Sequence, residues 1–194
     1  MVQALLAAAQ ERLQNGEMEA AGPLCRALLV ENPRSAPSQA NLGLALKQTG
    51  RMEEAIGAYR RALLLAPDNS QIHNNLGAAL HQAGTLDAAA ECYRKAVILA
   101  PGVPGLYHNL GSLLRDETRL DEATATFHWA LRLDPGHPDL HGGLAILEQY
   151  RDCLDRSISA HRRALVLQPG RADFHINFGN GLHQAGQLPF AETI

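Results

Sequence analysis

Five prolines recur at one constant interval along this 194-residue chain. Each of them follows the one before by 34 positions, at Pro33, Pro67, Pro101, Pro135 and Pro169. A fixed period of this length is typical of repeat proteins, in which each unit has an apolar face that is buried only when neighbouring units stack. The period therefore predicts one structural unit used repeatedly, and a function that depends on an extended surface rather than on a catalytic pocket.

Alignment on the prolines divides the chain into repeats 2–35, 36–69, 70–103, 104–137 and 138–171, with an incomplete repeat 172–194. Apolar residues within each repeat follow helical spacing in two segments. In the second repeat, Leu42 and Leu46 indicate the buried side of a first helix, and Tyr59 and Ala62 that of a second helix. We therefore expect an all-α solenoid of stacked antiparallel helix pairs, about five and a half repeats long, forming a single domain over residues 1–194.

Small and aromatic residues recur at fixed repeat positions. A glycine ends the first helix in four repeats, at Gly16, Gly50, Gly84 and Gly186, whereas Thr118 and Asp152 replace it in two others. Glycine adopts the left-handed conformation that terminates a helix at little steric cost. Large rings recur in second helices, at Tyr59, Tyr93 and Phe127, and glycines recur inside first helices, at Gly43, Gly77, Gly111 and Gly179. We assign these rings and glycines to the core.

The order Leu-Gly, Leu, Ala, Tyr or Phe, Ala and Pro within each unit resembles the tetratricopeptide repeat, and the resemblance covers essentially the whole chain. It implies a right-handed superhelix whose first helices line a concave groove. It also implies that the groove binds a peptide segment of a partner protein, and that the chain is an adaptor rather than an enzyme.

An asparagine precedes the leucine of the first helix in four repeats, at Asn41, Asn75, Asn109 and Asn177, and Ala7 and Gly143 interrupt this series. An amide both donates and accepts hydrogen bonds, so a column of asparagines could bind a peptide backbone irrespective of its side chains. The series resembles the repeats of the O-linked N-acetylglucosamine transferases and related bacterial proteins. The alternative is that these amides bridge helices or loops within the solenoid. By the family's geometry, the other peptide-binding candidates are Asn74, His81, His108, Gln48, Gln82 and Arg115.

Charge and composition argue against several other functions. The net charge of −3 is too balanced to indicate nucleic acid or an anionic membrane as partner. Three cysteines without paired metal-ligand spacing indicate a reducing compartment, and no signal peptide is apparent, so a cytoplasmic location is expected. Three histidines share one repeat position, at His73, His141 and His175, but stacked helices hold such side chains too far apart for one metal ion. No cofactor, metal site or catalytic constellation is expected.

The fifth repeat departs from the pattern. Gly142 and Gly143 lie inside its first helix, Glu148 replaces an apolar packing residue, and Ser157 and His161 replace the expected alanine and ring. These changes predict a soft joint with altered curvature, unless they are mere drift. Pro23 in turn predicts a kinked or imperfect first unit.

Three functions remain open at this point. The first is an adaptor that binds a peptide, and the second is the recognition arm of a larger glycosyltransferase-like protein. The third is a scaffold that forms homo-oligomers through solenoid ends that lack a polar capping helix. We favour the adaptor, because the asparagine series gives it a binding surface.

Overall fold

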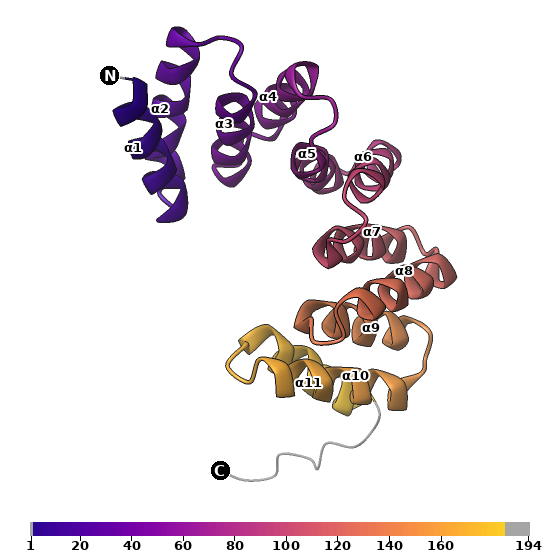
Figure 1. Cartoon of the computed structure of the whole chain (residues 1–194). Coiled ribbons are helices and arrows are strands. Elements are labelled where there is room, and N and C mark those ends of the chain that lie inside the picture. The colour runs from indigo at the N-terminus through magenta and orange to yellow at the C-terminus, as the bar shows by residue number, and fades with distance from the viewer. Residues whose placement is uncertain (1, 185–194) are drawn as a thin grey trace. The chain divides into compact units, whose positions relative to one another are not determined.

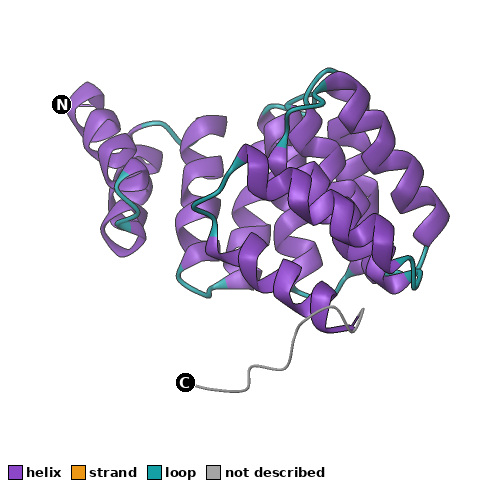
Figure 2. Ribbon diagram, turned by 90° about the horizontal axis from the view of Figure 1, so that it is seen from below, coloured by secondary structure: helices purple, strands orange, loops and turns teal. Residues whose placement is uncertain are grey.

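The computed structural model describes residues 2–184, and within this range the chain is entirely helical, with helices joined by short loops (Figure 1, Figure 2). The helices are α1 (Val2–Gln14), α2 (Met18–Glu31), α3 (Ala36–Gln48), α4 (Met52–Leu65), α5 (Ser70–Gln82), α6 (Leu86–Leu99), α7 (Pro104–Asp116), α8 (Leu120–Leu133), α9 (Pro138–Tyr150), α10 (Leu154–Leu167) and α11 (Ala172–Gln184). Each first helix starts where the proline alignment begins a repeat.

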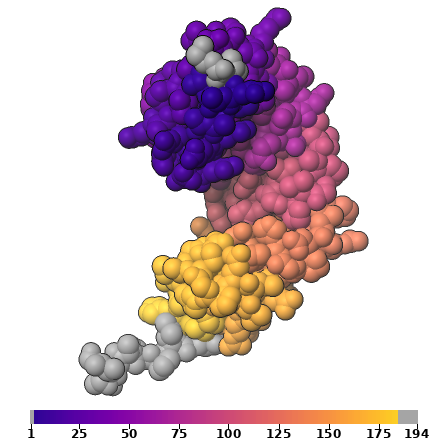
Figure 3. Space-filling view, turned by 60° about the vertical axis from the view of Figure 1, so that its left-hand side comes forward, coloured from indigo at the N-terminus to yellow at the C-terminus, as the bar shows by residue number. Residues whose placement is uncertain are grey.

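The chain divides into two compact units, Met1–Ala100 and Pro101–Ile194. In the first unit α1 packs on α2, α3 on α4 and α5 on α6, while α2–α3 and α4–α5 contacts join successive pairs. In the second unit α7 packs on α8 and α9 on α10, and α8–α9 and α10–α11 contacts join the pairs. Figure 3 shows one face of the surface that the described residues form, coloured by position along the sequence. The predicted all-α fold of stacked helix pairs is confirmed, whereas a single domain and a right-handed superhelix stay predictions.

Local sequence explains where the helices begin and end. Asn69 caps α5, because its side-chain oxygen accepts a hydrogen bond from the backbone N–H of Ile72 at 3.0 Å. At the other end of first helices, Gly50 and Gly84 both have φ of +78°, as the sequence predicts. Thr118 and Asp152 hold the same left-handed conformation without glycine, at φ of 60° and 57°. Gly186 lies outside the described residues. Pro23 does not interrupt α2, which runs on to Glu31.

The core is built around one ring per repeat. Tyr59, Tyr93 and Phe127 are buried, as predicted. A Cβ atom added to Gly43 would lie 2.8 Å from the ring of Tyr59, and one added to Gly77 would lie 2.8 Å from the ring of Tyr93. Such distances are too short for real contacts, so each ring lies directly against the backbone of its paired first helix only because that helix has a glycine there.

The two glycines of the fifth repeat also leave room for buried rings. This argues against the alternative that they are random sequence changes. A Cβ atom on Gly142 would lie 2.9 Å from the ring of Phe174, and one on Gly143 would lie 2.6 Å from the ring of Phe127. Gly143 occupies the repeat position of the asparagines, so the ring of Phe127 excludes an asparagine there. The softness and altered curvature of this repeat stay predictions.

Replacing Gly143 with alanine is expected to destabilise the second unit by about 1–3 kcal/mol, because the added methyl group overlaps the buried ring of Phe127. This cost exceeds the gain in helix propensity of about 1 kcal/mol. Gly105→Ala is the matched control, since nothing lies within 4 Å of the added methyl group. Urea denaturation followed by circular dichroism measures both variants. A Gly143→Ala variant as stable as the control would show that the ring moves aside freely.

Candidate functional site

Asn41 of α3 and Asn75 of α5 line one hollow of the first unit, with a volume of about 270 Å³. Both side chains are half-buried. The hollow lies between two first helices and the loop that precedes α5, and its other lining residues are Ala36, Pro37, Ala40, Leu44, Ala66, Asn69, Gln71 and Ile72. The lining has no charged side chain. Two asparagines therefore share one neutral recess on the first-helix side of this unit.

The hydrogen bonds of these two asparagines do not connect helices. The side-chain oxygen of Asn75 accepts a hydrogen bond from Gln71 Nε2 at 3.1 Å, one helical turn away on α5. Asn41 forms no side-chain hydrogen bond with any residue that the structure describes. The alternative, in which the amides bridge neighbouring helices, has no support at this pair. Their remaining donors and acceptors are available to a ligand in the hollow.

The other candidates of the first unit differ in exposure. Gln48 and Gln82 are exposed at the ends of α3 and α5, and Asn74 and His81 are half-buried on α5. The His81 ring meets the Tyr93 ring edge-on, with centroids 6.4 Å apart. His81 therefore contributes to packing around the core ring, in addition to any contact with a ligand.

In the second unit, Asn109 and Asn177 are again half-buried. His108 Nδ1 lies 3.4 Å from the side-chain oxygen of Asn109, and the His108 ring packs edge-on against Phe127. Burial lowers the pKa of His108 below its ordinary value, so the neutral ring is favoured. Arg115 donates from both Nε and Nη2 to Asp116 Oδ1, at 2.9 and 2.8 Å. Its guanidinium is thus already paired with a neighbouring carboxylate.

The column of histidines has a structural role that the sequence did not reveal. In His73, His141 and His175, ring atom Nε2 lies 2.8, 2.9 and 2.7 Å from the carbonyl oxygen of Pro67, Pro135 and Pro169, respectively. Tyr107 occupies the same repeat position, and its hydroxyl donates a hydrogen bond to the carbonyl oxygen of Pro101 at 2.9 Å. Because a carbonyl only accepts, each ring must present Nε2–H. This position therefore supplies a donor that fixes the loop containing the repeating proline.

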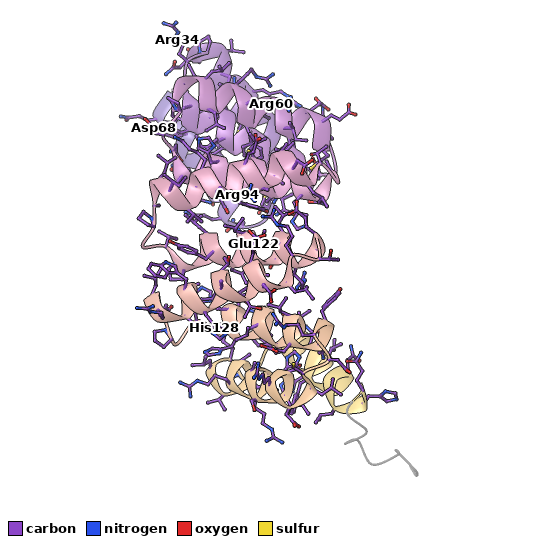
Figure 4. The ribbon with its side chains drawn as sticks, turned by 90° about the vertical axis from the view of Figure 1, so that its right-hand side faces the viewer. Arg34, Arg60, Asp68, Arg94, Glu122 and His128 are labelled. Carbon is purple, nitrogen blue, oxygen red and sulfur yellow. The ribbon has the colours of Figure 1, made fainter. Side chains whose placement is uncertain are left out.

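Second helices present charged side chains to solvent. Arg60 and Arg94 are exposed and labelled in Figure 4. Among residues 2–184, no three side chains of the metal-binding types come together as a metal site would require. None of the described helices has the length and apolar character needed to cross a membrane.

Comparison with known proteins identifies the repeat. Two sequence models described as tetratricopeptide repeat match residues 40–104 and 104–137. No curated protein matches the chain.

Solved structures of repeat proteins superpose on most of the chain. A structure titled for Pseudomonas aeruginosa pilF has a TM-score of 0.81 and 21% identity, covering 96% of this chain and 85% of that one. TTC0263, a thermophilic TPR protein of Thermus thermophilus, has a TM-score of 0.79 and 21% identity, covering 94% of this chain and 100% of that one. YrrB, titled a TPR protein with an unusual peptide-binding site, has a TM-score of 0.69 and 22% identity, covering 92% of this chain and 88% of that one. At this level of identity the likeness shows the fold alone.

Proposed function

We propose that this chain, which belongs to the tetratricopeptide repeat family, is a non-catalytic scaffold that binds an extended peptide segment of a partner protein. The peptide lies along the first helices, and the asparagines bind its backbone. The observation that supports this proposal most directly is the neutral hollow shared by Asn41 and Asn75. YrrB, which has a similar fold, is described as having a peptide-binding site, and this is consistent with the proposal.

The chemistry of the hollow favours a neutral segment over an acidic tail. Every residue that lines the hollow is uncharged, so the lining offers no cationic side chain that could pair with a terminal carboxylate. Asparagine amides can pair with the N–H and C=O groups of an extended backbone. Affinity then depends mainly on the peptide backbone, and the apolar lining favours small uncharged side chains.

Selection from a random peptide library, followed by fluorescence anisotropy with a selected peptide, tests this function. The double variant Asn41→Ala/Asn75→Ala is expected to bind at least about tenfold more weakly, because each lost hydrogen bond to a partly buried amide contributes about 0.5–1.5 kcal/mol. N-methylation of the peptide amides that contact the asparagines is expected to weaken binding to a similar degree.

Asn32→Ala is the matched control, since Asn32 is an exposed asparagine in a loop between helices. Its affinity should equal that of the unmodified protein, and circular dichroism should show the same helix content in all variants. Unchanged binding by the double variant, or indifference to N-methylation, would contradict recognition of the backbone by these asparagines.

A further inference from the structure

Another hollow lies in the second unit, away from the asparagines, and has a volume of about 680 Å³. It lies between the second helices α8 and α10, with α9 beneath. Its lining comprises His128, Leu131, His141, Leu144, Glu148, Asp155, Arg156, Ser159, Ala160 and Arg163. His128, labelled in Figure 4, marks the α8 side. Three apolar side chains, those of Leu131, Leu144 and Ala160, share this lining with Ser159 and six ionisable groups.

Glu148 is the unusual member of this lining. Its side chain is 5% exposed, and its Oε2 atom is buried without a hydrogen-bond partner among the described residues. The second, third and fourth repeats have leucine at this position, at Leu46, Leu80 and Leu114, and all three are buried, whereas the first repeat has Arg12. A buried carboxylate without a partner is unfavourable unless a cation or hydrogen-bond donors compensate it. The chain therefore has a charged residue where its own pattern shows that an apolar one fits.

An equivalent hollow in the first unit gives an internal comparison. It lies between α2, α3 and α4, has a volume of about 370 Å³ and has Leu46 in place of Glu148. There Arg61, the counterpart of Arg163, donates from Nε to Gln39 Oε1 at 3.3 Å. In the fifth repeat His141 replaces that glutamine, and its Nε2 is occupied by the carbonyl of Pro135. Arg163 thus lacks the acceptor that Arg61 has, and the larger hollow has an acidic floor.

We propose that the hollow lined by Glu148 binds an alkyl guanidinium or alkylammonium group. The cation pairs with the carboxylate of Glu148 at the floor, where burial of this carboxylate reduces its screening by water. The alkyl part of the ligand contacts Leu131, Leu144 and Ala160. Either a small organic cation or a lysine or arginine side chain of a protein supplies this chemistry.

The other charged groups around the hollow are compatible with a cation. Asp155, Arg156 and Arg163 are all exposed, so water and salt screen their fields more effectively than that of the buried Glu148. Long arginine side chains can also turn outward into solvent. The buried carboxylate therefore determines the sign of the ligand charge.

NMR titration of the full chain with butylguanidinium and with the peptide Gly-Gly-Arg-Gly-Gly tests the proposal. We expect saturable shifts in α8, α9 and α10, and weaker binding by roughly tenfold or more in Glu148→Gln, which removes the charge and keeps the shape. The same peptide with citrulline, the neutral isostere of arginine, should bind the unmodified protein at least about tenfold more weakly than the arginine peptide does. Binding of butylguanidinium but not of the arginine peptide identifies a small-molecule site, whereas binding of both identifies a site for a protein side chain.

Two further variants separate binding from folding. Glu148→Leu restores the residue of the second, third and fourth repeats, and it should fold and lose binding. Ser159→Trp fills the hollow from an exposed position on α10 and should also lose binding with Glu148 intact. Asp152→Asn is the matched control for a general charge effect, because Asp152 is exposed and does not line the hollow, and the affinity of this variant should change little. Measurable but equal binding of the arginine and citrulline peptides, undiminished ligand binding by Glu148→Gln, or the absence of saturable shifts with either ligand at millimolar concentrations would overturn the proposal.

Discussion

Replacing Phe127 with alanine is expected to lower the free energy of unfolding of the second unit by about 3–5 kcal/mol. Phe127 is 0% exposed, and its ring lies against the backbone of two first helices, at Gly111 of α7 and Gly143 of α9. The His108 ring packs against its edge, with centroids 6.1 Å apart. Removal of the ring leaves a cavity among three helices that glycines cannot fill. Urea denaturation measures the loss.

Trp129→Ala is the matched control, because this larger ring is on the same helix and is 50% exposed. It loses a hydrogen bond from its Nε1 to the hydroxyl of Tyr107 and some packing, so a cost near 1 kcal/mol is expected. Hydrogen exchange should also show that Phe127→Ala mainly exposes amides of α7, α8 and α9, because repeats depend on their immediate neighbours. Equal losses from the two variants would show that the ring is not the centre of the packing.

The helix pairs could be predicted from the sequence because the repeat multiplies a weak local signal. A single pair of apolar residues such as Leu42 and Leu46 does not by itself establish a helix. The same pair recurs every 34 residues together with a proline, and this repetition makes the prediction of a helix pair firm. The rings and glycines were predicted for the same reason, since Tyr59 and Gly43 recur together. No repeated sequence feature predicts the orientation of one compact unit relative to the other, because such an orientation depends on small rotations from one repeat to the next.

The candidate site was only partly predictable. Sequence placed Asn41 and Asn75 in one column, and the structure shows that they share a hollow. The interruption at Gly143 could not be explained from sequence, because it depends on where the Phe127 ring lies in three dimensions. The histidine column did contain a usable signal: histidine and Tyr107 both carry a donor six residues after the repeating proline.

The polar residues of the fifth repeat show a second reason why the site could not be predicted fully from the sequence. Sequence marked Glu148 as a departure from an apolar position, but not the hollow beside it. A hollow depends on the volumes of side chains from three helices, and no local pattern encodes that sum. His161 is a second departure of this kind. The sequence alone does not show whether its ring nitrogens have hydrogen-bond partners, because that depends on side chains of α9 and α11.

The stability of the second unit is expected to fall as the pH decreases from about 6.5 to about 4, because of His161. This ring is 0% exposed, and neither of its nitrogens has a hydrogen-bond partner among the described residues. Burial lowers the pKa of His161 from 6.5 to about 4. Between these values the unfolded chain binds a proton that the folded chain does not, so acid favours unfolding. The full effect is about 3 kcal/mol, reached near pH 4.

The control restores the pattern of the other repeats. His161 occupies the position of Tyr59, Tyr93 and Phe127, and Ala145 stands where their paired glycines stand. A larger ring at 161 would meet the methyl group of Ala145, so the matched variant is His161→Phe/Ala145→Gly. It keeps every other titrating group, and subtracting its pH profile from that of the unmodified protein isolates the contribution of His161.

Urea denaturation at intervals between pH 4 and pH 7.5 measures the difference. Between pH 7.5 and pH 4 the double variant should lose about 3 kcal/mol less stability than the unmodified protein, and the difference between the two profiles should be independent of pH above about pH 7, where His161 is neutral in the folded and unfolded chain. A constant offset between the two profiles would mean that the folded protein binds a proton at His161 as readily as the unfolded chain. In that case the imidazolium of His161 must donate a hydrogen bond to a nearby acceptor, such as the Ser157 hydroxyl or the Gln149 side-chain oxygen. Burial would then not be the only influence on the pKa of His161.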